Sequence, residues 1–180
     1  MIKSILIVIA LLILAILIYA ATQPDSFRIE RSITIKAPPE TIFPLLNDFH
    51  HWQAWSPWEK IDPATKTVYS GAAGGVGAIY EWAGNNEVGQ GRMEIIEASF
   101  PVKIVLKIDF IKPFEGHNII EFTLLPQGDV TTVNQAMYGP SPYISKVMGL
   151  FFSMDKMVGQ KYEQGLANLK ALAESKGVNQ

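Results

Sequence analysis

The chain has 180 residues, 48% of them apolar, and a net charge of −2 from 15 basic and 17 acidic side chains. This length fits one domain with an additional segment. The mixed charge provides no basic surface, so we expect no nucleic-acid partner. Because the chain contains no Cys, it forms neither disulfide bonds nor thiolate metal sites.

The N-terminus is an uncharged apolar run. Ile5–Ala21 contains no charged residue, and its 17 residues are near the lower limit for crossing a bilayer as a helix. Tyr19 lies near the far end, where an aromatic belt residue is expected. We predict a transmembrane helix over residues 1–22, a linker over 23–26 and a single-pass membrane protein.

Two alternatives to the anchor stay open. A cleaved signal peptide would place small residues at positions −3 and −1 of the cut. Cleavage after Ala21 puts Tyr19 at −3, and cleavage after Ala20 puts Ile18 there, so both fit poorly. The third possibility is a helix buried in the domain core.

The charges beside the apolar run bear on membrane orientation. Lys3 favours a cytoplasmic N-terminus and therefore a periplasmic or other extracytoplasmic domain. Arg28 and Arg31 on the other side weaken this bias, so the orientation stays open.

The region after the linker begins with a strand and two short helices. Apolar and polar residues alternate from Arg28 to Lys36, which predicts a strand whose apolar face is interrupted by Arg31. Pro38 and Pro39 end it and open a first short helix. A second short helical stretch follows, and Pro57 should end it at the preceding residue.

Strand patterns and short turns then dominate the chain up to residue 138. The predicted strands cover 66–70, 78–83, 88–98, 102–111, 118–125 and 130–138. Tight turns such as Gly84-Asn85-Asn86 indicate an antiparallel meander. Alternation within the strands predicts one buried and one solvent-exposed face.

The C-terminal stretch has the apolar spacing of a helix. The apolar positions are Ile144, Val147, Met148, Phe151, Met154, Val158, Tyr162, Leu166, Leu169 and Leu172. They fit one long helix or a short helix leading into a long one. Together the elements predict an α+β fold in which a curved antiparallel sheet wraps around this helix and encloses an apolar cavity.

Asp48–Trp58 is the most unusual segment, with three of the four tryptophans and two of the three histidines. The tryptophans could line a cavity or only pack the short helices onto the sheet, and both interpretations stay open. His50 and His51 have no third His or Cys ligand nearby, so we expect no metal site. The glycine-rich stretch 71–77 lacks the Lys-Ser/Thr of a phosphate loop, and we expect no cofactor.

Several segments carry a resemblance to a known family. They are Ile33–Phe43, Asp48–Trp58, Tyr80–Trp82, Val88–Met93 and Gly165–Lys170. They resemble the SRPBCC superfamily, whose helix-grip fold is shared by START domains and birch-pollen allergens, and most closely its polyketide cyclase/dehydrase-like branch. The resemblance covers about residues 27–175, so we assign residues 27–180 to one such domain.

We expect a monomer, and the resemblance implies that it binds a hydrophobic or lipid-like small molecule, without fixing any chemistry. Two alternatives are a cyclase/dehydrase-like enzyme on an apolar substrate and a protein-interaction or chaperone-assisting module. For the enzyme, Asp155, Glu121 or His51 would transfer the proton, although Asp155 fits a solvent-exposed position as well. Related strands often carry Trp where this chain has Gln135, which implies a roomier and more polar site.

Alternation and helical spacing predict which side chains face the cavity. We predict no catalytic residue with a motif of its own. The predicted cavity residues are Trp55, Trp58, Tyr80, Trp82, Met93, Phe110, Phe122, Gln135, Met137, Met148 and Phe152.

Overall fold

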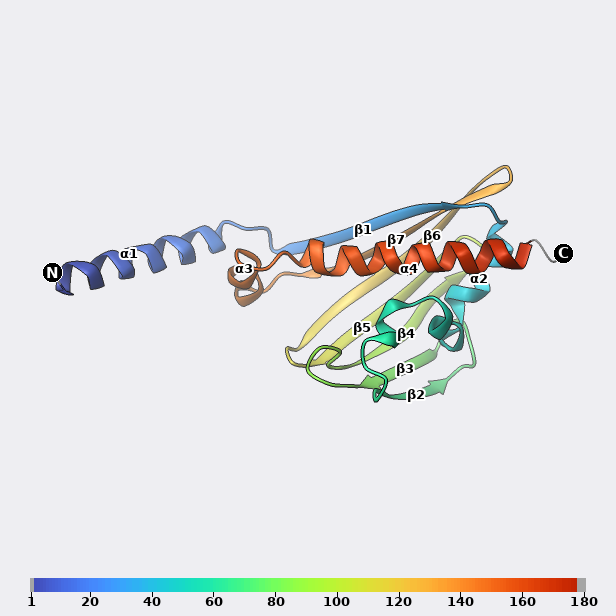
Figure 1. Cartoon of the computed structure of the whole chain (residues 1–180), viewed down its shortest axis with the longest axis horizontal. Coiled ribbons are helices and arrows are strands. Elements are labelled where there is room, and N and C mark those ends of the chain that lie inside the picture. Colours follow the sequence, from blue (N-terminus) through green and yellow to red (C-terminus); the bar gives the residue numbers. More distant parts are fainter. Residues whose placement is uncertain (1, 178–180) are drawn as a thin grey trace.

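A curved sheet of seven antiparallel strands wraps around the long C-terminal helix in the computed structural model, which describes residues 2–177 (Figure 1). The spatial order is β1-β7-β6-β5-β4-β3-β2. The strands are β1 Ser26–Ile35, β2 Lys66–Gly71, β3 Ala78–Ala83, β4 Gln90–Ser99, β5 Lys103–Lys112, β6 Gly116–Gln127 and β7 Val130–Pro140. The predicted α+β helix-grip architecture is confirmed.

The helices are α1 Ile2–Ala21, α2 Pro39–Asn47, α3 Tyr143–Gly149 and α4 Met154–Gly177, with 3-10 turns η1 Phe49–Ala54 and η2 Pro57–Lys60. The C-terminal stretch is therefore a short helix leading into a long one. The two short helices predicted after the first strand are α2 and η1, and η1 ends before Pro57 as expected. The additional turn η2 was not predicted.

The residues Asp48–Trp58, called the tryptophan segment below, provide hydrogen-bond donors for the C-terminal end of α2. The last carbonyls of a helix have no partner within it. The indole N–H of Trp52 donates to the Leu46 carbonyl, and that of Trp55 donates to the Leu45 carbonyl, both at 3.0 Å. Both tryptophans are buried. This segment therefore packs α2 onto the sheet and provides donors for two of its last carbonyls.

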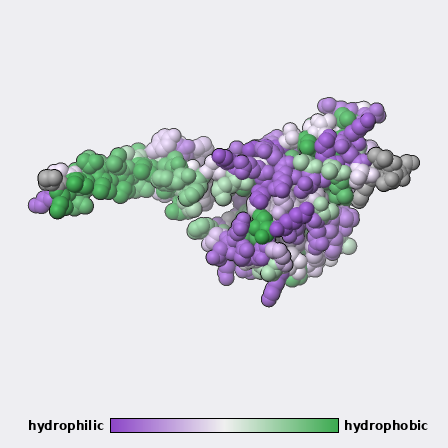
Figure 2. Space-filling view, viewed as in Figure 1, coloured by the Kyte–Doolittle hydropathy of each residue, from purple (hydrophilic) through white to green (hydrophobic). Residues whose placement is uncertain are grey.

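Helix α1 extends away from the sheet and carries an almost uniformly apolar surface (Figures 1 and 2). An 18-residue window of this 20-residue helix has a mean hydropathy of 3.1, and only 6% of that window is buried. The alternative of a helix buried in the core is therefore wrong. The helix is long and apolar enough to cross a membrane, and a signal sequence at the same position has the same properties.

Candidate ligand-binding cavity

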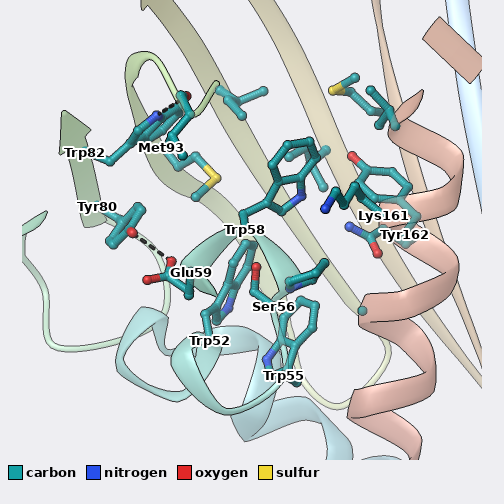
Figure 3. A pocket seen from close by; sticks show the side chains of 18 of the residues that line it. Trp52, Trp55, Ser56, Trp58, Glu59, Tyr80, Trp82, Met93, Lys161 and Tyr162 are labelled. Atoms are coloured by element: carbon teal, nitrogen blue, oxygen red, sulfur yellow. Dashed lines mark hydrogen bonds between the residues drawn. The ribbon is translucent and has the colours of Figure 1, made fainter. Parts of the chain in front are cut away.

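An apolar cavity of about 220 Å³ lies between the concave face of the sheet, the tryptophan segment and α4 (Figure 3). Aromatic and aliphatic side chains form most of its wall. The lining residues are Trp52, Trp55, Ser56, Pro57, Trp58, Glu59, Tyr80, Trp82, Val88, Met93, Ile108, Phe110, Ile120, Gln135, Met137, Met154, Val158, Lys161, Tyr162 and Gly165.

The strand register builds the sheet side of this cavity from neighbouring rows. Tyr80 on β3 pairs with Met93 on β4, and Met93 pairs with Ile108 on β5. In the next row Gly91 pairs with both Trp82 and Phe110. A Cβ at Gly91 would overlap the Trp82 ring, so the glycine leaves the space that this ring occupies.

Trp55 and Trp58 contact the cavity from different depths. Trp55 is only 2% exposed and is part of the core, whereas Trp58 is 39% exposed. The structure places Trp58, and not Trp55, at the cavity mouth. The reason is that the Trp55 indole bonds inward to α2, while Trp58 follows on η2 and lies beneath Lys161, whose Nζ is 5.9 Å from its ring centre.

A carboxylate and a phenol pair in the cavity wall. The Tyr80 hydroxyl donates to Glu59 Oε1 at 2.7 Å (Figure 3). Burial, and then the neighbouring Glu59 carboxylate, raise the pKa of Tyr80 well above its usual value. Glu59 is half-buried on η2 and lines the cavity.

Two further polar side chains lie deeper. Gln135 on β7 and Tyr162 on α4 both line the cavity and are each 4% exposed. Burial raises the pKa of the Tyr162 hydroxyl, and the nearby Gln135 side chain partly offsets the rise. The Tyr162 hydroxyl therefore stays protonated at pH 7, and the Gln135 amide carries no charge. The buried end of the cavity is polar but uncharged.

The family model for polyketide cyclase/dehydrase and lipid transport matches residues 26–174. The chain belongs to this family. The match covers the sheet, the tryptophan segment and most of α4, so the cavity lies entirely within the family domain. A search of curated proteins found no match.

Solved structures share the fold at low sequence identity. Protein CV1439 from Chromobacterium violaceum is 18% identical, with a TM-score of 0.58 over 84% of this chain and 99% of that chain. The Aha1 dimer from Colwellia psychrerythraea is 20% identical, with a TM-score of 0.57 over 82% and 96%. Ginseng major latex-like protein 151 from Panax ginseng is 11% identical, with a TM-score of 0.56 over 83% and 99%. At these identities the likeness establishes the fold alone.

Eight of the predicted cavity residues lie on the wall of this family domain's cavity: Trp55, Trp58, Tyr80, Trp82, Met93, Phe110, Gln135 and Met137. Phe122 does not. It pairs with Gln135 on the same face of the sheet, but Trp52 and Trp55 cover it with ring centres at 6.0 and 6.2 Å. Alternation identified the correct face but could not show which residue another ring would cover.

Met148 and Phe152 also lie outside the cavity. Met148 is 38% exposed on α3, and Phe152 is 62% exposed in the link to α4. Helical spacing was used to select both residues, but the helix breaks between Gly149 and Met154. The orientation of the side chains on α3 therefore does not follow from the helical spacing of α4.

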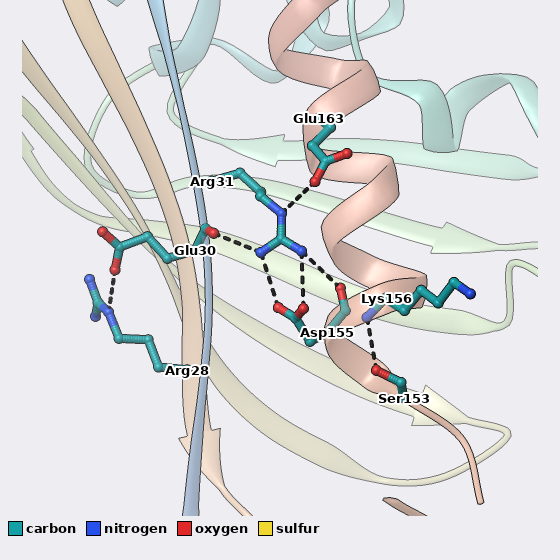
Figure 4. A network of polar contacts seen from close by, with 7 residues as sticks. All are labelled: Arg28, Glu30, Arg31, Ser153, Asp155, Lys156 and Glu163. Atoms are coloured by element: carbon teal, nitrogen blue, oxygen red, sulfur yellow. Dashed lines mark hydrogen bonds and ion pairs between the residues drawn. The ribbon is translucent and has the colours of Figure 1, made fainter.

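The proton-transfer candidates of the sequence interpretation do not reach the cavity. Asp155 is solvent-exposed and pairs with Arg31, its Oδ1 lying 3.0 Å from Nη1 (Figure 4). Glu163 binds the same guanidinium at 2.6 Å. This ion pair accounts for the charged residue that interrupts the apolar face of β1. The Arg31 hydrogen bonds hold the pKa of Asp155 below its usual value, so it stays ionised at neutral pH.

Glu121 and His51 also have partners outside the cavity. Glu121 pairs with Lys103 at 3.6 Å, and His51 Nδ1 lies 2.9 Å from the Pro44 carbonyl. Neither lines the cavity. Within residues 2–177 there is no group of three or more His, Asp and Glu side chains that could hold a metal ion.

Sequence reasoning missed several lining residues, with Ile108, Val158 and Tyr162 among them. Ile108 had a detectable signal, because it alternates with Phe110 on a strand already assigned one buried face. Val158 and Tyr162 were in the helical stripe, but spacing alone did not distinguish the part over the cavity from the part over the core.

A second, more open hollow of about 470 Å³ lies between the α1–β1 juncture and α3. Gln23 and Pro24 form its wall on the juncture side, and Leu150 belongs to its wall beside α3. Phe110 and Met154 line both this hollow and the main cavity. These two side chains therefore form the division between the cavity and the base of α1.

Proposed function

We propose that the protein is a membrane-anchored module that binds a hydrophobic or lipid-like small molecule in its cavity. The observation that carries the proposal is the composition of the cavity wall. The sheet and α4 border the cavity, and most of the side chains that line it are aromatic or aliphatic. A few polar groups in an otherwise apolar hollow are typical of small-molecule sites. The family description, which includes lipid transport, supports the same class of ligand.

The volume limits what fits. Sites for drug-sized ligands span about 300–1,000 Å³, and this cavity has about 220 Å³. A compact ring system fits inside it. A longer chain would pass between Phe110 and Met154 into the second hollow, which leads toward α1.

The test is titration of the full chain in lipid nanodiscs with naphthalene, measured by calorimetry against empty nanodiscs. We expect saturable binding of one molecule per chain in addition to partitioning into the lipid. Heats equal to those of empty nanodiscs across the titration would contradict the proposal.

The membrane part of the proposal is supported by the surface beside α1. The Tyr143 hydroxyl of α3 donates to the Leu17 carbonyl of α1 at 2.8 Å, so the two helices are in contact. Lys146 of α3 bonds Asp25 in the juncture at 2.5 Å. The adjoining exposed apolar residues are Ile144, Met148, Phe151 and Phe152. If α1 spans the bilayer, this apolar surface lies at the membrane interface, and Lys3 favours the extracytoplasmic side.

Labelling can test this placement because the chain has no native Cys. Phe152→Cys carrying an environment-sensitive fluorophore should be blue-shifted in vesicles and quenched by brominated lipid. Val68→Cys on β2 is the control, since Val68 is similarly exposed, at 54%, and the strand β2 lies far from α1 (Figure 1). Equal quenching at both positions, or a mature N-terminus at residue 21 or 22 by mass spectrometry, would contradict the anchored arrangement.

The enzyme alternative has one observation in its favour, the Glu59–Tyr80 pair in the cavity wall. A carboxylate beside a bound apolar substrate could act as a general base. The protein-interaction alternative stays a prediction, because fold likeness at 20% identity carries no partner. We therefore favour ligand binding.

A further inference from the structure

Gln135 places an unpaired polar atom in the apolar wall. The residue is 4% exposed and lines the cavity, and its Oε1 has no hydrogen-bond partner among the described residues. Buried amide oxygens are almost always satisfied, because leaving one unpaired costs its desolvation free energy. Because the Gln135 side chain lines the cavity, a turn of its amide group brings this atom to a molecule bound there, which can supply the missing donor.

The group beside Gln135 restricts what that molecule can be. Tyr162 is equally buried, and its hydroxyl interacts with the Gln135 side chain. The cation in the cavity wall, Lys161, lies over the ring of the exposed Trp58 at the mouth (Figure 3). The wall's carboxylate, Glu59, is already bonded to the Tyr80 hydroxyl. A carboxylate or ammonium at Gln135 would therefore lose its hydration against an uncharged amide and phenol. The buried end suits a neutral donor.

We propose that the ligand is an apolar molecule with one neutral hydrogen-bond-donating group, an alcohol or a phenol, which binds with its hydroxyl on Gln135 Oε1. The inference rests on the proposed function and adds the ligand's chemical class and its orientation. The apolar body would then contact Trp82, Met93 and Phe110, while the hydroxyl points into the protein.

Water is the competing occupant. A buried water makes two to four hydrogen bonds, and Gln135 with Tyr162 could supply two. A water that stays in place would satisfy Oε1 by itself, and the protein would then bind apolar molecules without regard to a donor group. A preference for donors therefore separates the two occupants.

The experiment compares naphthalene, 2-naphthol and 2-methoxynaphthalene, which share a ring system but of which only 2-naphthol donates. Each is titrated by calorimetry into the full chain in nanodiscs, with empty nanodiscs as reference. In the wild type we expect 2-naphthol to bind about tenfold tighter than 2-methoxynaphthalene, which corresponds to about 1.4 kcal/mol.

Gln135→Met keeps a side chain of similar length and removes the acceptor. It should abolish the preference while naphthalene binding is kept, and thermal melts should show a fold as stable as the wild type because an unpaired acceptor has been removed. Gln127→Met on the exposed end of β6 is the matched control and should keep the preference.

The outcomes separate this inference from the proposed function. Equal affinity for all three probes in the wild type, or a preference that survives in Gln135→Met, would overturn the inference and leave ligand binding intact. Binding of none of the three would overturn both.

Discussion

Trp55→Ala should lower the free energy of unfolding by roughly 3–5 kcal/mol, the range for removing a fully buried Trp ring. The ring is 2% exposed and packs against Trp52 and Phe122. Its loss would also leave the Leu45 carbonyl without its indole donor inside the core. Chemical denaturation of the full chain in nanodiscs, followed by fluorescence of the remaining tryptophans, measures the change.

Two variants separate the contributions to that loss. Trp55→Phe keeps most of the packing but removes the N–H donor, and should cost about 1–3 kcal/mol. Trp58→Ala removes the same side-chain type from an exposed position and should cost less than Trp55→Ala. If the two alanine variants are equally stable, the distinction between core Trp55 and mouth Trp58 is wrong.

Val158→Trp should reduce naphthalene binding at least tenfold, about 1.4 kcal/mol, by filling the cavity from α4. Val158 lines the wall and is half-buried, so a larger ring there occupies the space that a ligand needs. The measurement is the same calorimetric titration in nanodiscs.

The control is Leu172→Trp. Leu172 is also half-buried on α4 but packs against the core and does not line the cavity. Both substitutions carry an overpacking cost of about 1–3 kcal/mol. Only Val158→Trp should lose binding, and an equal loss in both variants would mean that general destabilisation, not occlusion, is the cause.

The fold could be predicted because its signals are local. The period-two alternation and tight turns defined the meander, and the boundaries of β3 at Ala78–Ala83 were predicted to the residue. Pro57 marked where η1 stops. The break between α3 and α4 was one of two alternatives left open, since Gly149 is compatible with either a continuous or an interrupted helix.

The cavity was harder to predict because it depends on which side chains cover one another. Phe122 and Gln135 are cross-strand neighbours, yet rings from the tryptophan segment cover only the first. The role of Arg31 required knowing that α4 crosses β1, which brings Asp155 to a residue 124 positions earlier in the chain. Contacts of this kind are set by tertiary packing, and periodicity contains no information about them.

The central claim is that the cavity holds an apolar molecule, and native mass spectrometry of the full chain tests it most directly. The chain would be isolated in nanodiscs from the membranes of its host, without added ligand. We expect wild-type protein to carry one bound small molecule that is extractable into organic solvent, and Val158→Trp to carry none. Wild-type protein recovered only at the mass of the bare polypeptide, with no extractable molecule above that in empty nanodiscs, would contradict the account.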